Sequence, residues 1–170
     1  RRSRRWRARG AKWRALGIRS EKGRPDELLR LSPGMHIKAR EGGTSIFDPV
    51  VCELVYRWYT REGDYVLDPF AGGSVRGIVA ACLGRSYLGI DLRPEQVEAN
   101  RRQADEIATG DYRPQWVVGD ADDLPGLCPE VQADLIFTCP PYHDLEVYSD
   151  DPADLSAMPA PSPRYIEAGE

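Results

Sequence analysis

The sequence lacks the marks of a disulfide-stabilised, zinc-binding or membrane-spanning protein. Its four cysteines lie far apart and form no CxxC pair, which argues against a disulfide framework and a zinc knuckle (Cys52, Cys82, Cys128 and Cys139). No apolar run approaches the roughly 18 residues that a membrane span requires. The chain begins with Arg rather than Met and no apolar signal segment follows, so we expect a piece of a longer intracellular protein.

Two common phosphate-binding signatures are also missing. The sequence contains neither a Walker-type lysine motif nor a GxGxxG turn. What it does contain is typical of a soluble globular protein, with 41% hydrophobic and 29% charged residues. A length of 170 residues is enough for one domain and too short for two ordinary ones.

Charge is distributed unevenly along the chain. Residues 1–24 contain eleven Arg or Lys and one Glu, a local charge of +10, whereas the whole chain carries −4 and the remainder therefore −14. A basic arm on an acidic body indicates a polyanionic partner for the arm. Trp6 and Trp13 lie seven residues apart in this arm. It is therefore expected to be either a short amphipathic helix or a poorly ordered tail, whose Trp rings could stack on bases.

The remaining chain alternates between strand and helix patterns. Asp48 followed by Pro49 predicts the start of a helix that ends near Gly63. Strands are predicted at 65–70, 86–91, 115–119 and 133–138, with helices at 75–83 and 94–108 between them. Strands separated by helices indicate an α/β fold with a mostly parallel sheet of about four strands. The expected organisation is an arm at 1–24, a linker at 25–45, a core at 46–150 and an irregular tail at 151–170.

Polar or glycine-rich sequences follow all four predicted strands. They are Asp68-Pro-Phe-Ala-Gly-Gly-Ser74, Gly89-Ile-Asp91, Gly119-Asp120 and Cys139-Pro-Pro-Tyr142. In an open parallel sheet, ligands bind outside the carboxyl ends of the strands. The common placement of these sequences therefore predicts one binding site at that edge.

The first three of these sequences suit a nucleoside that carries an anionic group. Gly72 and Gly73 allow close backbone approach, and the next helix N-terminus, with Ser74 as a cap, favours a carboxylate or phosphate. Asp91 can accept from both hydroxyls of a ribose, and Asp120 from an adenine amino group. Each also has a simpler interpretation: a tight turn, a helix cap and a solvated acidic loop.

The fourth sequence suits a planar group that carries an amine. Pro140 and Pro141 fix the backbone and remove two N–H donors, so the carbonyls before them remain acceptors. The ring of Tyr142 follows directly and can stack on a base. Cys139 precedes the prolines, and we expect it to position the amine rather than to act as a nucleophile.

In this order and spacing, the four sequences resemble those of the S-adenosylmethionine-dependent DNA amino-methyltransferases, with phage-type DNA methylases most similar. The segments TSIFDPVVCEL and PPYHDLEVYSDDP add to the likeness, which covers about residues 44–155. The resemblance implies a Rossmann-like methyltransferase fold, a three-layer sandwich whose sheet is incomplete here because the chain stops after its fourth strand. It also implies a cytoplasmic enzyme of a bacterial or phage-infected cell, associated with restriction and modification.

The resemblance implies roles by position. S-adenosylmethionine is the implied cofactor and DNA the implied partner, with the basic arm as a phosphate contact and with no membrane or metal involved. The cofactor-binding residues it implies are Thr44, Ser45, Phe47, Asp68, Phe70, Gly72, Gly73, Asp91 and Asp120. The residues that it implies hold the target base are Cys139, Pro140, Pro141 and Tyr142.

Two departures from the family pattern leave alternatives open. The family turn usually ends Gly-Ser-Gly, where this chain has Gly72-Gly73-Ser74. The family usually has Asp, Asn or Ser before Pro-Pro-Tyr, where this chain has Cys139, so N6 of adenine and N4 of cytosine both remain candidate targets. RNA or a protein glutamine could replace DNA as the substrate, and the chain could also be a non-catalytic fragment that binds nucleic acid.

Overall fold

The computed structural model describes residues 3–19, 47–141 and 151–157. The chain divides into two compact units, one formed by 1–23 with 45–139 and the other by 24–44 with 140–170. The described helices of the first unit are α1 (Arg4–Ala15), α2 (Pro49–Tyr59), α3 (Val75–Cys82), α4 (Pro94–Ile107), the 3-10 turn η2 (Ala121–Asp123) and α5 (Leu124–Leu127). Its strands are β1 (Tyr65–Asp68), β2 (Ser86–Asp91), β3 (Gln115–Val118) and β4 (Leu135–Ile136).

The four strands form one parallel sheet in the order β3-β2-β1-β4. In this register Asp68 of β1 lies beside Gly89 of β2, and Asp91 of β2 lies beside Val118 of β3. The chain moves outward from β1 to β3 and then crosses back, so that β4 pairs with the other side of β1. The strand order therefore reverses at β1, where open α/β sheets bind their ligands. This topology confirms the predicted α/β fold.

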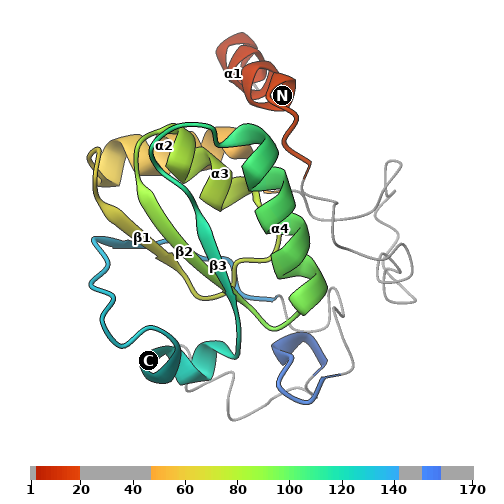
Figure 1. Cartoon of the computed structure of the whole chain (residues 1–170). Coiled ribbons are helices and arrows are strands. Elements are labelled where there is room, and N and C mark those ends of the chain that lie inside the picture. The colour runs from red at the N-terminus through yellow and green to blue at the C-terminus, as the bar shows by residue number, and fades with distance from the viewer. Residues whose placement is uncertain (1–2, 20–46, 142–150, 158–170) are drawn as a thin grey trace. The chain divides into compact units, whose positions relative to one another are not determined.

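Helices α2, α3 and α4 pack side by side on one face of the sheet (Figure 1). Two glycines allow the closest packing on that face. A Cβ on Gly77 of α3 would lie 2.5 Å from the Trp116 ring, and a Cβ on Gly89 of β2 would lie 2.8 Å from Ala71 and from Trp116. The rings of Tyr87 and Trp116 occupy this space, with their centroids 5.6 Å apart. The described residues thus contain one helical layer of the expected sandwich.

Most element boundaries agree with the sequence predictions. Asp48 caps α2 by accepting a hydrogen bond from the Val50 N–H at 2.9 Å, and Gly84 follows α3 with a φ of 80°. Strand β4 is shorter than predicted, with two residues in place of six. The side chain of Ile136 in this strand is 62% exposed.

The arm is built into the first unit as helix α1. Trp6 Nε1 donates to Asp48 Oδ2 at 3.0 Å, and Trp13 Nε1 donates to Glu53 Oε2 at 2.9 Å. Of the two interpretations of the arm, the structure has the helix. The expectation that Trp13 stacks on a base is wrong, because its side chain is buried against α2.

The described part of the second unit is small. It comprises Pro140, Pro141 and residues 151–157, which end in the 3-10 turn η3 (Leu155–Ala157). Asp154 accepts hydrogen bonds from the N–H and the hydroxyl of Ser156 at 2.9 and 2.6 Å. This local bonding suits the irregular segment that the sequence predicts there.

Candidate functional site

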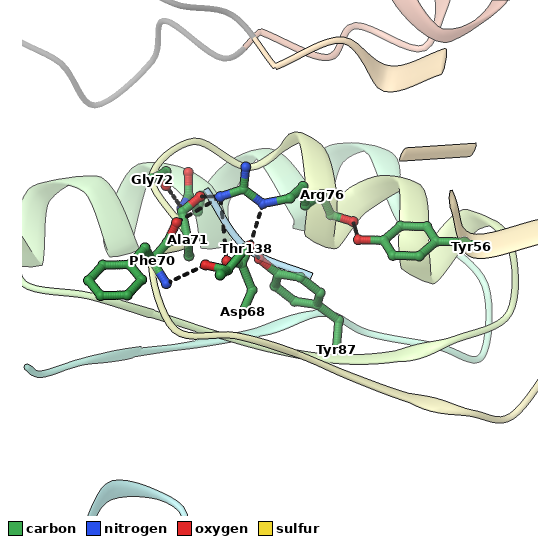
Figure 2. Close-up of polar contacts among 9 residues, drawn as sticks. Tyr56, Asp68, Phe70, Ala71, Gly72, Arg76, Tyr87 and Thr138 are labelled. Atoms are coloured by element: carbon green, nitrogen blue, oxygen red, sulfur yellow. Dashed lines mark hydrogen bonds and ion pairs between the residues drawn. The ribbon is translucent and has the colours of Figure 1, made fainter. Parts of the chain in front are cut away.

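The turn after β1 is organised by a buried ion pair. Asp68, the last residue of β1, is completely buried, and its Oδ2 lies 2.5 Å from Arg76 Nε (Figure 2). The Tyr87 hydroxyl donates to the same oxygen at 2.6 Å. A buried carboxylate is stable only when it is paired and hydrogen-bonded in this way. In this structure Asp68 is therefore a structural anchor of the turn.

Arg76 connects that anchor to the turn backbone. Its Nη2 donates to the carbonyls of Phe70 at 2.7 Å and Ala71 at 2.9 Å, as Figure 2 shows. Burial alone would lower the pKa of Arg76, but the Asp68 carboxylate and the Tyr87 hydroxyl outweigh it, and the net pKa is raised. The guanidinium therefore stays charged and holds two consecutive carbonyls.

The remaining turn backbone is held from inside the fold as well. Asn100 Nδ2 donates to the Gly72 carbonyl at 2.7 Å, and the Ala71 N–H donates to the Ile90 carbonyl at 2.8 Å. In a trans peptide the N–H points opposite to the carbonyl. The N–H groups of Gly72 and Gly73 therefore point away from Arg76 and Asn100. They form no hydrogen bond with the described part of the chain.

The turn also contacts the strand on the other side of β1. The Phe70 N–H donates to Thr138 Oγ1 at 3.0 Å (Figure 2), which ties the turn to the exit of β4. Phe47 packs edge-on against Phe137, and its ring centroid lies 4.6 Å from Arg76 Cζ. The structure thus brings Phe47, Phe70 and the end of β4 together around Arg76.

Asp91 and Asp120 follow adjacent strands at the same edge of the sheet. The Gly119 N–H donates to the Asp91 carbonyl at 3.1 Å, which brings the two strand ends together. Asp91 Oδ1 accepts from the Arg93 N–H at 2.9 Å, and Asp120 Oδ1 accepts from the Asp122 N–H at 3.0 Å. Both carboxylates are half-buried. The three predicted strand-end features therefore share one edge.

The structure shows less about the other predicted site residues. Cys139 lies half-buried after β4, and Pro140 and Pro141 follow it in the second unit. Thr44, Ser45 and Tyr142 lie outside the described residues. Ser74 occupies the N-cap position of α3 as predicted, but its hydroxyl makes no capping hydrogen bond and instead donates to Gln103 Oε1 at 3.0 Å.

Sequence reasoning missed the residues that hold the turn from within: Arg76, Tyr87, Asn100 and Thr138. One of them does carry a signal in the sequence. Arg76 is the only charged residue in α3, VRGIVAAC. A charge in an apolar helix that packs on a sheet needs a buried partner, and Asp68 at the end of the preceding strand is the nearest acidic residue. The polar residues of α4, including Asn100, carry no comparable signal.

Two kinds of feature are absent from the described ranges. Residues 3–19, 47–141 and 151–157 contain no cluster of three or more His, Cys, Asp or Glu arranged to hold a metal ion. None of the helices in those ranges has the length and apolar character needed to cross a bilayer.

Comparison with known proteins identifies relatives for the central part of the chain. Residues 49–102 match the DNA methylase family. The chain is 48% identical over 44 residues to the Type II methyltransferase M2.DpnII of Streptococcus pneumoniae, covering 26% of this chain and 16% of that protein. It is also 53% identical over 51 residues to M.XycI of Xanthomonas campestris pv. cyanopsidis, covering 30% and 17%.

Each match covers only part of this chain and part of the related protein. A third relative, the DNA adenine methyltransferase YhdJ of Escherichia coli, is 44% identical over 46 residues, which cover 27% of this chain and 16% of that protein. Among solved structures, TrmN from Thermus thermophilus is 27% identical with a TM-score of 0.47, covering 56% of this chain and 29% of that one. The chain therefore spans only a minor part of the curated relatives it matches. These matches bear out the predicted resemblance: residues 49–102 are similar to the DNA methylase family, and parts of the chain are similar to Type II DNA methyltransferases.

Proposed function

We propose that this chain supplies the cofactor-binding part of a DNA amino-methyltransferase. The protein would move a methyl group from S-adenosylmethionine to an exocyclic amine of a flipped base, N6 of adenine or N4 of cytosine. The observation that carries the proposal is the set of strand-end groups at one sheet edge. Asp91 and the outward-facing N–H groups of Gly72 and Gly73 fall within the segment that matches DNA methylases.

The turn after β1 fits the amino-acid end of this cofactor. Its carbonyls are occupied by Arg76 and Asn100, so the groups it can offer a ligand are N–H donors beside the N-terminus of α3. N–H donors at a helix N-terminus favour a carboxylate. We assign Gly72 and Gly73 to backbone contacts, and Asp68 and Phe70 to positioning of the turn.

The other cofactor contacts follow from the strand ends. Asp91 would accept hydrogen bonds from the ribose hydroxyls, and Asp120 from the adenine amino group. Thr44, Ser45 and Phe47 would lie near the methionine end. When bound, S-adenosylmethionine supplies a methyl group that its sulfonium has already activated.

The residues after β4 would hold the base. Cys139 and the carbonyl of Pro140 would orient the exocyclic amine, with Pro141 fixing the backbone and Tyr142 stacking on the ring. Extruding a base from the duplex costs a few kcal/mol, and stacking on an aromatic side chain returns about 1–3 kcal/mol. These residues position the amine and exclude water, so no covalent enzyme intermediate is required.

The test is to incubate the protein with labelled S-adenosylmethionine and duplex DNA, and to analyse the released nucleosides by mass spectrometry. We expect N6-methyladenine or N4-methylcytosine. Tyr142→Ala should abolish transfer to DNA while leaving cofactor binding intact. Label found only in RNA or in protein would assign another substrate, and duplex binding without any transfer would show a non-catalytic module.

A second pair of variants tests the cofactor site directly. Asp91→Asn should weaken binding of S-adenosylhomocysteine in calorimetry, because an amide is a poorer acceptor for two hydroxyls than a carboxylate is. Asp105→Asn on the exposed face of α4 is the matched control. Equal affinities for the two variants would contradict the assignment of Asp91.

A further inference from the structure

Helix α1 has an unusual distribution of charge. Residues 3–19 contain seven basic residues and no acidic one, and all seven are exposed (Arg4, Arg5, Arg7, Arg9, Lys12, Arg14 and Arg19). Three of them lie in the first turns, where the helix dipole is positive and disfavours cations. Arg5 and Arg9 repel each other at a spacing of four residues, which the ion pair of Arg9 Nε with Glu53 Oε1 at 3.8 Å offsets in part. The helix therefore carries repulsion that a polyanion would relieve.

The fold holds this helix in place at three points. Trp6 bonds to Asp48 and Trp13 to Glu53, both of which belong to the start or middle of α2. Beyond the helix, Gln103 of α4 accepts from the Arg19 N–H at 2.7 Å and donates to the Arg19 carbonyl at 2.8 Å. The arm is thus a positioned surface, since both tryptophans and the chain after the helix are anchored to the methylase core.

Docking leaves the cations in two rows. Gly10 and Trp13 are buried against α2, so the opposite side of the helix faces outward. One flank presents Arg5 and Lys12 and the other Arg7 and Arg14, each pair seven residues apart and on one side of the helix. Between the rows lie Arg4 and three exposed alanines, Ala8, Ala11 and Ala15, spaced three or four residues apart. A low ridge between two rows of cations lets a phosphate-bearing surface approach closely.

We infer that α1 is a preformed docking surface for the sugar-phosphate backbone of duplex DNA. The inference rests on the proposed function for its choice of polyanion. The chemistry of the helix argues against an anionic membrane, because Trp6 and Trp13 bond to Asp48 and Glu53 and the outward stripe carries Arg4 and small alanines in place of large apolar side chains. An acidic peptide remains as an outcome of the test.

The test measures duplex binding without cofactor, by fluorescence anisotropy between 50 and 200 mM salt. The double variants Arg5→Gln/Lys12→Gln and Arg7→Gln/Arg14→Gln each remove one row and keep good helix formers. Each should lower the slope of log affinity against log salt by about 2, since each lost phosphate contact lowers it by about 0.9. Affinity at 100 mM salt should fall by about tenfold or more.

The control changes the same amount of charge elsewhere. Arg61 and Arg102 are exposed and lie outside α1, so Arg61→Gln/Arg102→Gln should leave both the slope and the affinity near those of the unaltered chain. Equal losses in this control would overturn the inference, and so would unchanged binding by both row variants. Polyglutamate or duplex RNA that binds more tightly than duplex DNA would also overturn it.

A separate measurement tests the docking. Trp13→Phe removes the indole donor to Glu53 and keeps an aromatic ring, so trypsin should cleave the arm faster than in the unaltered chain. Equal cleavage rates would contradict a docked helix. Because duplex binding is measured without S-adenosylmethionine, a protein that binds DNA through α1 but transfers no methyl group would refute the proposed function alone. Methyl transfer with no contribution from α1 would refute this inference alone.

Discussion

Replacing Arg76 should separate the stability of the fold from the order of the turn after β1, which we propose binds the cofactor. The Arg76 side chain is 5% exposed and Asp68 is completely buried, with 2.5 Å between their charged atoms. Arg76→Met leaves the Tyr87 hydroxyl as the side-chain partner of the Asp68 carboxylate among the described residues. Removing one member of a buried ion pair costs about 3–5 kcal/mol. We expect a loss of that size in the free energy of unfolding, measured by urea denaturation.

A double variant then separates the two effects. In Asp68→Leu/Arg76→Met both charges are gone, and apolar replacements of buried ion pairs are often neutral or stabilising. Much of the stability should therefore return. The carbonyls of Phe70 and Ala71 still lack their donor, so the turn remains without its anchor.

Cofactor affinity should follow the turn rather than the stability. A hydrogen bond to a charged group contributes about 1.5–3 kcal/mol. Without Arg76 the turn must become ordered when the cofactor binds, and that free energy is lost from binding. The affinity for the cofactor should then fall by about tenfold to hundredfold, because 1.4 kcal/mol is a factor of ten. Calorimetry with S-adenosylhomocysteine on the double variant measures it. Arg76→Lys should give an intermediate loss, since lysine keeps the charge but not the planar fork.

One result would refute this reasoning. If the double variant recovers its stability and binds S-adenosylhomocysteine as tightly as the unaltered chain, Arg76 does not position the turn. Arg102→Gln is the control for loss of an ion pair that is not buried, because Arg102 pairs with Glu98 at 2.8 Å on the exposed face of α4. Such exposed pairs contribute about 0.3–0.5 kcal/mol.

Three further outcomes test the core. Gly89→Ala should lower the free energy of unfolding by about 1–3 kcal/mol, because the added Cβ would lie 2.8 Å from Trp116, whereas Gly110→Ala meets nothing within 4 Å and should have little effect. A thiol reagent should label exposed Cys82 well before buried Cys52 in the native state. Burial, followed by repulsion from Asp68, raises the pKa of Tyr87, and burial also raises the pKa of Cys52. The folded state therefore holds these protons more tightly than the unfolded state. The contribution of these two groups to stability should be complete below about pH 9 and be lost as the pH rises past their ordinary values of 9.0 and 10.0. Flat stability from pH 8 to 11 in denaturation curves would contradict this.

The elements that sequence predicted well are those set by local chemistry. Strand β2 spans Ser86–Asp91 as predicted, because Gly84 ends the helix before it and Pro94 starts the one after. The apolar pattern and the turn residues both lie within a few positions of the boundaries they determine. Strand β4 follows a different rule. Its length depends on neighbours, and in the described residues it pairs only with β1, over Leu135 and Ile136.

The candidate site divides in the same way. Glycines and carboxylates at strand ends could be predicted, since parallel strands bring their carboxyl ends to one edge whatever the side chains do. The residues that set the turn geometry could not, because their partners are distant in sequence. Thr138 reaches Phe70 across 68 positions, and Asn100 reaches Gly72 across 28. Arg76 is the exception, because a charged residue in an apolar helix predicts a buried partner of opposite charge.

The role of Ser74 shows why a local prediction fails when a distant partner competes. Its hydroxyl could cap α3, but it donates instead to Gln103, whose amide also clasps the backbone of Arg19. Gln103 is buried, so each of its polar atoms needs a partner inside the fold. Its amide satisfies this need by joining Arg19, beyond the end of α1, to Ser74 at the start of α3. The arm and the turn are therefore parts of one packed unit, although 84 residues separate Arg19 from Gln103.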